Sequence, residues 1–423
     1  MIPGLQILSQ LRLSLIGLLF AASFVIPVTT TQGGDWPGIL GPNRSGVAND
    51  EQLADNWLKK GPPVLWRKKV GSGFAGAAIV AGRAIVFHRI GDHDIADALD
   101  LNTGKPLWQA KFPTRYVPTI SSDDGPRCVP VIHDDAVYLY GAGGDLHCVA
   151  LSDGAMRWSR RIRKDYRAPD GYFGAGSTPI VEGDRLIINV GGARQGAGLV
   201  AVSLKTGKTL WKATDESASY SSPVAVTRDG VRHVVFVTRY HLLSVDPASG
   251  DVRFKIPFGK RGPTVNAANP VLIGPHVFVT SSYGTGSLLA KIKAKEAATV
   301  WRDEEILASQ YTTAVLHGKF LYSIDGRQDG APGRLKCIDP LKKTVRWTVS
   351  GFGIGSLILA DGKLLIVKTD GHLVLASPLP TKYQQLAEAR ITTDKLRALP
   401  ALSKGRLLIR DAKRLYCVGV GAR

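Results

Sequence analysis

The sequence is poor in cysteine, and its cysteines are not spaced as metal or redox sites require. The 423 residues include 4 cysteines, and no C-x-x-C occurs among them. Zinc-ribbon, thiol-redox and haem-attachment sites therefore have no support. The H-E-x-x-H spacing of zinc proteases and the G-x-S-x-G turn of serine hydrolases are absent as well. The sequence thus predicts no catalytic residue and no metal site.

Stretches with the periodicity of a long amphipathic helix are also scarce. Short apolar runs separated by Gly, Asp, Asn and Pro dominate the chain, which contains 47 glycines. This pattern is typical of an all-β protein. Hydrophobic residues make up 44% of the sequence, which suits a large core and argues against disorder.

The chain is strongly basic, but its basic residues are not clustered. The formal net charge is +19, with 54 Lys and Arg spread along the sequence and no dense run. One interpretation is a solvated basic surface. The other is attraction to an anionic partner, such as an acidic polymer or a membrane surface. A nucleic-acid partner is not expected, because that function needs a clustered basic stripe or a known reading module.

The first 33 residues have the composition of a targeting segment. Arg12 is the only charged residue before an apolar run from Leu13 to Val28. A basic residue followed by such a run is typical of a secretory signal, and the run is short for a membrane-spanning helix. No clear cleavage site follows, so an uncleaved anchor that holds the protein beside a membrane is the alternative. Both predict export to the periplasm or cell envelope.

A unit of about 45 residues recurs through the rest of the chain. Each copy has two apolar strands around a Gly or Asp turn, a third strand, a tight polar turn and a fourth strand that carries an aromatic residue. The clearest second halves are 96–108, 147–158, 200–211, 243–254 and 336–347, with a worn copy at 290–301. Four strands at this period predict the blades of a β-propeller.

One aromatic residue per unit recurs in phase and is predicted to pack against the next blade as a structural anchor. These anchors are Trp66, Trp108, Trp158, Trp211, Phe254, Trp301 and Trp347, spaced 42 to 53 residues apart. Cys148, Cys337 and Cys417 share one repeat position with Ala98, Ala201 and Ser244, so a small residue is needed there. Only Cys128 and Cys148 lie within one repeat, and a disulfide between them stays an open question.

Eight units can be counted, and the last, at 398–420, stops after its third strand. The strand at 64–70 stands alone before the first unit and is predicted to supply the missing outer strand, which closes the ring and removes an open sheet edge. The expected organisation is a signal peptide or anchor at 1–33, an extension at 34–63 and an eight-bladed propeller of four-stranded antiparallel blades at 64–420. The protein is expected to be a monomer.

The element formed by Ala98, Asp100, Thr103, Gly104 and Trp108 resembles the pyrroloquinoline-quinone-like (PQQ-like) propeller repeat. The segments 36–47 and 405–420 are similar to the opening and ending of exported bacterial propellers of that superfamily. The resemblance covers roughly residues 35–420. It implies the fold more than the function, because one fold serves many functions.

The resemblance implies two classes of function. Non-catalytic scaffolds similar to the BamB-type outer-membrane assembly factor present loops to partner proteins. Quinoprotein dehydrogenases instead bind PQQ and Ca²⁺ in the central funnel, and typically carry adjacent cysteines and long insertions. This chain has no adjacent cysteines and little beyond eight compact units. A scaffold without a cofactor is the main prediction, and a PQQ- and Ca²⁺-dependent dehydrogenase of alcohols or sugars is the alternative.

The segments that precede each innermost strand converge on one mouth of a propeller's channel, where a partner would bind. They are 72–76, 124–127, 172–177, 219–222, 265–269, 309–313 and 351–355. Their candidate binding residues are Phe74, Arg127, Phe173, Tyr220, Asn266, Asn269, Gln310, Tyr311 and Phe352. Aromatic side chains offer contact area, and Arg127 offers directed hydrogen bonds to a carboxylate or phosphate. The alternative is that these residues only form tight turns and pack.

Overall fold

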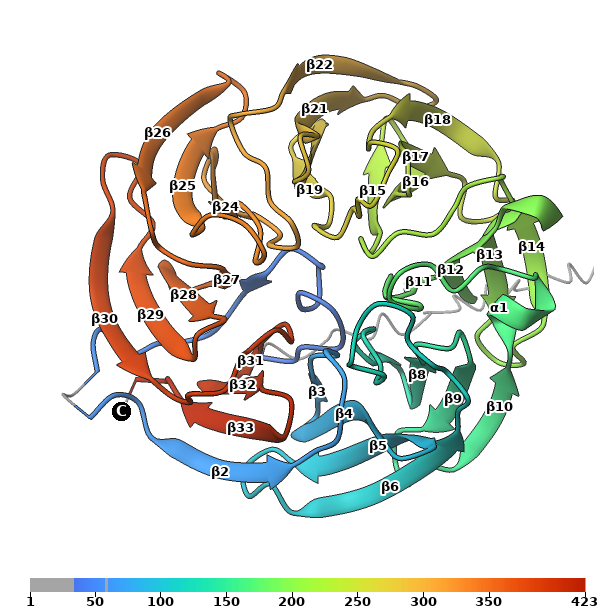
Figure 1. Ribbon diagram of the computed structural model, residues 1–423, viewed down its shortest axis with the longest axis horizontal. Coiled ribbons are helices and arrows are strands. Elements are labelled where there is room, and N and C mark those ends of the chain that lie inside the picture. Colours follow the sequence, from blue (N-terminus) through green and yellow to red (C-terminus); the bar gives the residue numbers. More distant parts are fainter. Residues whose placement is uncertain (1–33, 58–59, 423) are drawn as a thin grey trace, which may run out of the picture. The chain divides into compact units, whose positions relative to one another are not determined.

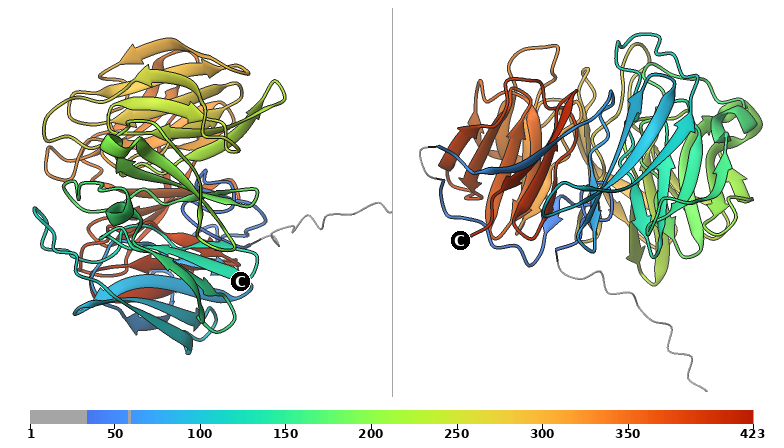
Figure 2. Two further views of the ribbon diagram at one scale, coloured as in Figure 1. Left: turned by 90° about the vertical axis from the view of Figure 1, so that its right-hand side faces the viewer. Right: turned by 90° about the horizontal axis from the view of Figure 1, so that it is seen from below.

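The computed structural model describes residues 34–57 and 60–422; the predicted signal or anchor segment lies outside them. Within the described chain, short antiparallel strands form eight sheets around a central axis (Figure 1). Figure 2 shows that the strands run between two opposite faces of this unit. The prediction of an eight-bladed, all-β propeller is confirmed.

In each of the first four blades the strands follow one another in chain order from the innermost to the outermost. Blade 1 holds β3 (Ala78–Val80), β4 (Arg83–Ile90), β5 (His93–Asp100) and β6 (Pro106–Pro113). Blade 2 holds β7 (Val131–His133), β8 (Ala136–Tyr140), β9 (Leu146–Ala150) and β10 (Met156–Arg160). Blade 3 holds β11 (Ile180–Glu182), β12 (Arg185–Gly192), β13 (Ala197–Ser203) and β14 (Thr209–Ala213). Blade 4 holds β15 (Val224–Arg228), β16 (Val231–Val237), β17 (His241–Val245) and β18 (Val252–Pro257).

The other four blades follow the same order. Blade 5 holds β19 (Val271–Ile273), β20 (His276–Ser281), β21 (Gly286–Ile292) and β22 (Ala297–Asp303). Blade 6 holds β23 (Val315–His317), β24 (Phe320–Asp325), β25 (Arg334–Asp339) and β26 (Thr344–Val349). Blade 7 holds β27 (Gly355–Ala360), β28 (Lys363–Lys368), β29 (His372–Ser377) and β30 (Gln384–Arg390). Blade 8 holds β31 (Ala401–Ser403), β32 (Arg406–Arg410), β33 (Arg414–Gly419) and, from the N-terminal side, β2 (Val64–Lys69).

Helical structure in the described residues is limited to the short helix α1 (Ile162–Asp165) and the 3₁₀ turn η1 (Ala193–Gln195). No helix in this part of the chain is long and apolar enough to span a membrane. The fold therefore depends on contacts between and within sheets.

Strand β2 closes the ring, as the isolated strand in the sequence predicted. It pairs antiparallel with β33 and becomes the outer strand of blade 8. Arg410, at the end of β32, ties this blade to blade 1. Its buried guanidinium donates hydrogen bonds of 2.9–3.0 Å to the carbonyls of Gly71, Ser72, Ala75 and Phe87. Strand pairing thus brings the N-terminal side of the chain into blade 8, and a buried cation joins blade 8 to blade 1.

Six of the eight blade junctions use a tryptophan indole. Each indole N–H donates a hydrogen bond of 2.8–3.0 Å to a carbonyl of the following blade: Trp66 to Leu101, Trp108 to Leu151, Trp158 to Leu204, Trp211 to Pro247, Trp301 to Pro340 and Trp347 to Leu379. Phe254 has no N–H and packs in one apolar cluster with Val277 and Ala290 of blade 5.

The indole packs against the glycine in the turn between the third and fourth strands of the following blade. Gly154 has a φ of 74°, and a Cβ there would lie 2.6 Å from the Trp108 ring. Gly104, Gly207 and Gly250 contact Trp66, Trp158 and Trp211 in the same way. Glycine is needed because the turn requires a positive φ and because the ring leaves no room for a side chain.

In six of the eight blades a small residue on the third strand lies opposite the anchor on the fourth. Cys148 pairs with Trp158, Cys337 with Trp347 and Cys417 with Trp66. All four cysteines are buried and free, so Cys128 and Cys148 form no disulfide. Burial raises the pKa of the Cys148 thiol to about 11, and thiols held in this way are poor nucleophiles.

The segment 34–54 docks among the inner strands, which the repeat pattern did not predict. Strand β1 (Val47–Ala48) pairs in parallel with β27 and makes blade 7 five-stranded. On either side of β1, Trp36 exchanges hydrogen bonds with Ile79 of blade 1, Arg44 donates to two carbonyls at the start of blade 3, and Glu51 accepts from two amides of blade 8. Figure 1 shows this segment (blue) near the central axis. It therefore braces several blades from within.

Candidate functional site

The mouth is formed by two sets of loops. Because the strands of each blade alternate in direction, the segment that leads into an innermost strand lies on the same face as the loop between the second and third strands. The sequence prediction considered only the first set. The second set includes 238–240 in blade 4, 282–285 in blade 5 and 326–333 in blade 6.

Polar side chains at the start of the inner strands bond each blade to the next. The amide of Val129 donates to Thr178 Oγ1, that of Thr178 to Ser222 Oγ, that of Ser222 to Asn269 Oδ1, and that of Asn269 to Thr313 Oγ1. These distances are 2.7–3.1 Å. The side chains satisfy buried amides that have no partner in their own sheet. This series explains the Ser, Thr and Asn content of the loops.

Three of the predicted binding residues are buried and contact the protein itself. Asn269 belongs to the series just described, and Asn266 donates to the carbonyls of Thr238 and Arg239. Phe352 is 8% exposed and packs at the edge of the Tyr383 ring. In this structure their side chains offer little surface to a partner.

The other predicted residues are half-buried and gather in pairs. Tyr220 Oη accepts a 2.8 Å hydrogen bond from the Phe173 amide, and the two rings meet edge to face. Gln310 donates to Tyr283 Oη over 2.8 Å, while Tyr311 Oη donates to Gln328. Burial raises the pKa of the Tyr220 and Tyr311 phenols. Both phenols are therefore neutral hydrogen-bonding groups near pH 7.

Arg127 lies against its own loop and a neighbouring ring. Its guanidinium donates to the carbonyls of Gly125 and Asp123 over 2.7 and 2.9 Å. Its Cζ lies 5.8 Å from the centre of the Phe74 ring, and Arg397 Cζ lies 5.2 Å from the same centre. Two guanidinium groups thus share one aromatic ring, at a distance where cation–π attraction acts.

Three further arginine–aromatic contacts come from residues that the sequence prediction missed. Arg239 Cζ lies 5.3 Å from the Tyr172 ring centre and 5.5 Å from that of Tyr240, and Arg327 Cζ lies 5.0 Å from that of Tyr283. Arg239, Tyr240, Tyr283 and Arg327 belong to the loops between second and third strands. The alternation of strand direction was the signal that could have identified them. We call Phe74/Arg127/Arg397, Tyr172/Arg239/Tyr240 and Tyr283/Arg327 the rim clusters.

One acid at the mouth end of blade 1 is unusually placed. Asp94 is 2% exposed, and its Oδ1 has no hydrogen-bond partner among the described residues. Burial raises its pKa to about 7, with the Arg89 charge opposing the shift. A Cβ at Gly141 of blade 2 would lie 2.6 Å from Asp94 Oδ2. This carboxyl is therefore sealed between two blades and is not open to a ligand.

The residues present do not match a cofactor-binding funnel. Ca²⁺ requires six to eight oxygen ligands, usually including several carboxylates. The described residues contain no group of three or more His, Cys, Asp or Glu side chains that could hold a metal ion. The described residues therefore show no carboxylate cluster of the kind that usually contributes to a Ca²⁺ site.

Comparisons with known proteins show which family the chain belongs to. No curated protein sequence matches it significantly. Residues 91–349, more than half of the chain, match the family described as outer membrane protein assembly factor BamB. The chain belongs to this family. The BamB match begins in the second half of blade 1 and ends in blade 6.

Solved structures with the same fold include a BamB protein and a quinohemoprotein dehydrogenase. BamB from Moraxella catarrhalis has a TM-score of 0.60 at 15% identity, with 85% of this chain and 98% of that one covered. The quinohemoprotein alcohol dehydrogenase from Comamonas testosteroni has a TM-score of 0.61 at 14% identity, with 92% and 81% covered. At such identities the similarity shows the fold alone, so function must be argued from the site.

Proposed function

We propose that this chain is a non-catalytic propeller of the cell envelope that binds a protein partner at the rim clusters. Membership of the BamB family supports a scaffold or binding role. The proposed location rests on one observation: several arginine side chains lie over aromatic rings at one face of the propeller. Arginine and the large aromatic residues are enriched in the hot spots of protein interfaces.

The charge of the chain indicates an acidic partner surface. A net charge of +19 attracts an anionic protein over long range, and salt weakens that attraction. At the rim, guanidinium groups already oriented over rings lose little freedom when a carboxylate binds. At the proposed site, long-range attraction would speed the encounter with the partner, and the guanidinium groups would then form directed hydrogen bonds with it.

Affinity purification from envelope extracts tests this proposal. The wild-type chain is compared with a rim variant, Arg239→Gln/Arg327→Gln, and with a matched variant on an outer hairpin, Lys205→Gln/Lys208→Gln, each of which removes two positive charges. We expect the same captured protein with the wild type and the hairpin variant, and its loss with the rim variant. Capture that depends on Lys205 and Lys208 and not on the rim would move the interface to the outer hairpins on the opposite face of the propeller.

The dehydrogenase alternative has its own assay. The purified chain is incubated with PQQ and Ca²⁺, and reduction of a dye is followed with alcohols or sugars as substrates. We expect no turnover above the protein-free control. Substrate-dependent dye reduction would overturn the non-catalytic part of the proposal.

A further inference from the structure

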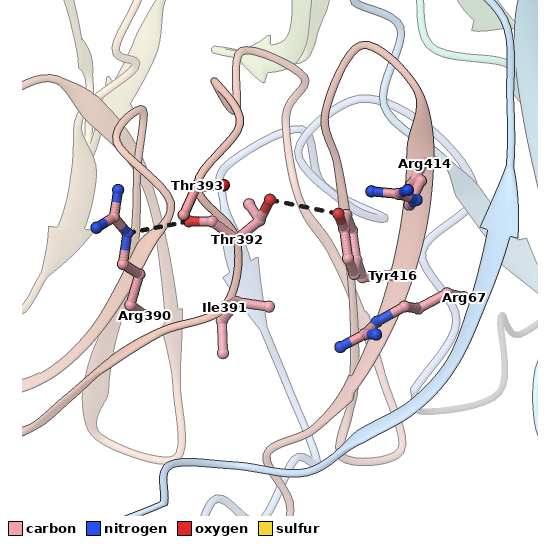
Figure 3. A pocket seen from close by; sticks show the side chains of 7 residues that line it. All are labelled: Arg67, Arg390, Ile391, Thr392, Thr393, Arg414 and Tyr416. Atoms are coloured by element: carbon pink, nitrogen blue, oxygen red, sulfur yellow. Dashed lines mark hydrogen bonds between the residues drawn. The ribbon is translucent and has the colours of Figure 1, made fainter.

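The junction between blades 7 and 8 contains a basic cavity that no comparison assigns. Its volume is about 480 Å³, and it is lined by Arg67, Arg390, Ile391, Thr392, Thr393, Arg414 and Tyr416. Figure 3 shows Arg67 and Arg414 extending from the blade 8 side toward the 391–393 segment, with Arg390 on the other side of that segment. We call this cavity the arginine pocket.

The positive charge in the arginine pocket is not neutralised by ion pairs. In the described chain, none of its three arginines has a carboxylate oxygen within 4.0 Å. The nearby Asp411 is 2% exposed and is occupied by the amides of Lys413 and Arg414 and by Tyr416 Oη, each at 2.7 Å. All three arginine side chains are exposed at the opening. Three guanidinium groups therefore face solvent without an ion-pair partner, although the charges of Asp411 and Asp394 act on Arg414 from farther away.

Fixed neighbours hold the walls of the pocket in place. Tyr416 is 3% exposed, and its ring lies 5.8 Å from Arg67 Cζ. Tyr416 Oη also lies 3.3 Å from Thr392 Oγ1, which joins the two blades across the pocket (Figure 3). Arg390 Nε donates to the Thr392 carbonyl, which leaves the terminal nitrogens of that guanidinium free. The donors are thus partly ordered before any ligand arrives, which lowers the entropy lost on binding.

The three positive charges of the arginine pocket favour a ligand that carries more than one negative charge. A single carboxylate carries one negative charge and is satisfied by one bidentate guanidinium, which would leave the other two arginines without a partner. A phosphomonoester carries about two charges near pH 7 and three acceptor oxygens, and arginine pairs with phosphate in a bidentate manner. We propose that the arginine pocket binds a phosphomonoester group, held by Arg67 and Arg414, with Arg390 adding positive potential at the rim.

The test is calorimetric titration of the purified full chain with glycerol 3-phosphate. We expect saturable binding that Arg67→Gln/Arg414→Gln weakens by about tenfold or more for each arginine, because each loses a charge-assisted hydrogen bond. The matched control, Lys105→Gln/Lys205→Gln, removes two exposed charges elsewhere and should bind as the wild type does. Acetate at equal ionic strength should bind far more weakly. Equal binding by both double variants, or no saturable binding by the wild type, would overturn the proposal.

Co-sedimentation with vesicles distinguishes a free ligand from a lipid headgroup. Vesicles that contain phosphatidic acid are compared with phosphatidylcholine vesicles, with the same two double variants. Binding that requires both phosphatidic acid and the two arginines identifies a membrane phosphomonoester as the ligand. Binding of glycerol 3-phosphate without vesicle binding identifies a soluble one. Both outcomes support the pocket, and both are independent of whether a protein binds at the rim clusters.

Discussion

The junction between blades 1 and 2 and the junction between blades 7 and 8 solve one packing problem in different ways. At the first, Trp108 is 8% exposed, donates to Leu151 and covers Gly154 of the next blade. At the second, the corresponding strand β30 has Ala387 opposite Leu375, and no indole crosses. Trp57 of the N-terminal extension packs against the same apolar cluster as Ala387. The regular junction is closed by an indole of its own repeat, whereas the outer strand of blade 7 supplies no indole to the irregular one.

This difference shows which blade junctions of a repeat fold leave space for a binding site. An indole with its carbonyl acceptor and glycine fills a junction, so nothing else fits there. The arginine pocket lies at a junction that lacks the indole. The junction between blades 4 and 5 is a milder exception, because Phe254 keeps the packing and loses only the hydrogen bond. Departures from the repeat are therefore the places to look for functions beyond folding.

The largest effect is expected at the closing junction, where Arg410→Met should lower the free energy of unfolding by about 5 kcal/mol. The substitution removes the guanidinium hydrogen bonds to four carbonyl groups, of which that of Ser72 still accepts from the Arg89 amide, and the loss of buried hydrogen bonds is costly. Chemical denaturation of both proteins measures the difference. Arg414→Met on the neighbouring exposed site is the control and should change stability little. Equal effects of the two substitutions would show that the buried guanidinium does not hold the ring closed.

The regular junction is tested by Trp108→Ala, which should cost about 4 kcal/mol through lost apolar contact and the cavity left behind. Trp108→Phe keeps most of the packing and should cost about 1 kcal/mol for the hydrogen bond to Leu151. The same denaturation measurement applies. If Ala387→Gly at the irregular junction were as costly as Trp108→Ala, the contrast between the two junctions would be wrong.

A smaller effect is expected for Gly154→Ala, at about 2 kcal/mol. The new Cβ would meet the Trp108 ring at 2.6 Å, and the turn requires a φ of 74°. Gly82→Ala, at a φ of 72° with no atom within 4 Å of the added Cβ, carries the backbone strain alone. Thermal melting of the two variants separates the contact with the ring from the strain, and equal melting temperatures would remove the role of the ring.

The smallest effect concerns Asp94, at the mouth end of the regular junction. Burial raises its folded-state pKa to about 7, above an unfolded value near 4. The folded state therefore binds the proton more tightly, and this group lowers stability progressively as pH rises from about 4 to about 7. Asp94→Asn should raise stability at pH 8 and leave it nearly unchanged at pH 4. Melting curves at the two pH values check this, and a gain of equal size at both would contradict the assignment.

The propeller could be predicted from the sequence because its anchors are local and periodic. The counterparts of Gly104 and Trp108 recur in several units at a constant separation from each other. The incomplete last unit identified 64–70 as the closing strand. The docking of 34–54 could not be predicted, since Trp36, Arg44 and Glu51 make single contacts with blades far away in the chain and follow no period. Arg410 was missed for the same reason.

The position of the mouth could be predicted from the sequence, but only some of the residues that line it could be. The loops before the inner strands were recognised by their Gly, Ser and aromatic content, which also serves the series of hydrogen bonds through Thr178, Ser222 and Asn269. Residue type could not separate Asn269, which satisfies a buried amide, from Tyr220, which stays half-exposed. Arg239 and Arg327 lie in loops of ordinary composition, and only the fold brings them beside aromatic rings.

The claim that the rim clusters are the binding surface is tested most directly by photo-crosslinking in living cells. A photoreactive phenylalanine analogue replaces Tyr283 at the rim or Leu210 on an outer strand, where Leu210 is 46% exposed. We predict one discrete crosslinked protein from position 283 and none from position 210, with Arg239→Gln/Arg327→Gln abolishing the crosslink. A crosslink from position 210 alone would contradict the account and place the partner on the side of the propeller.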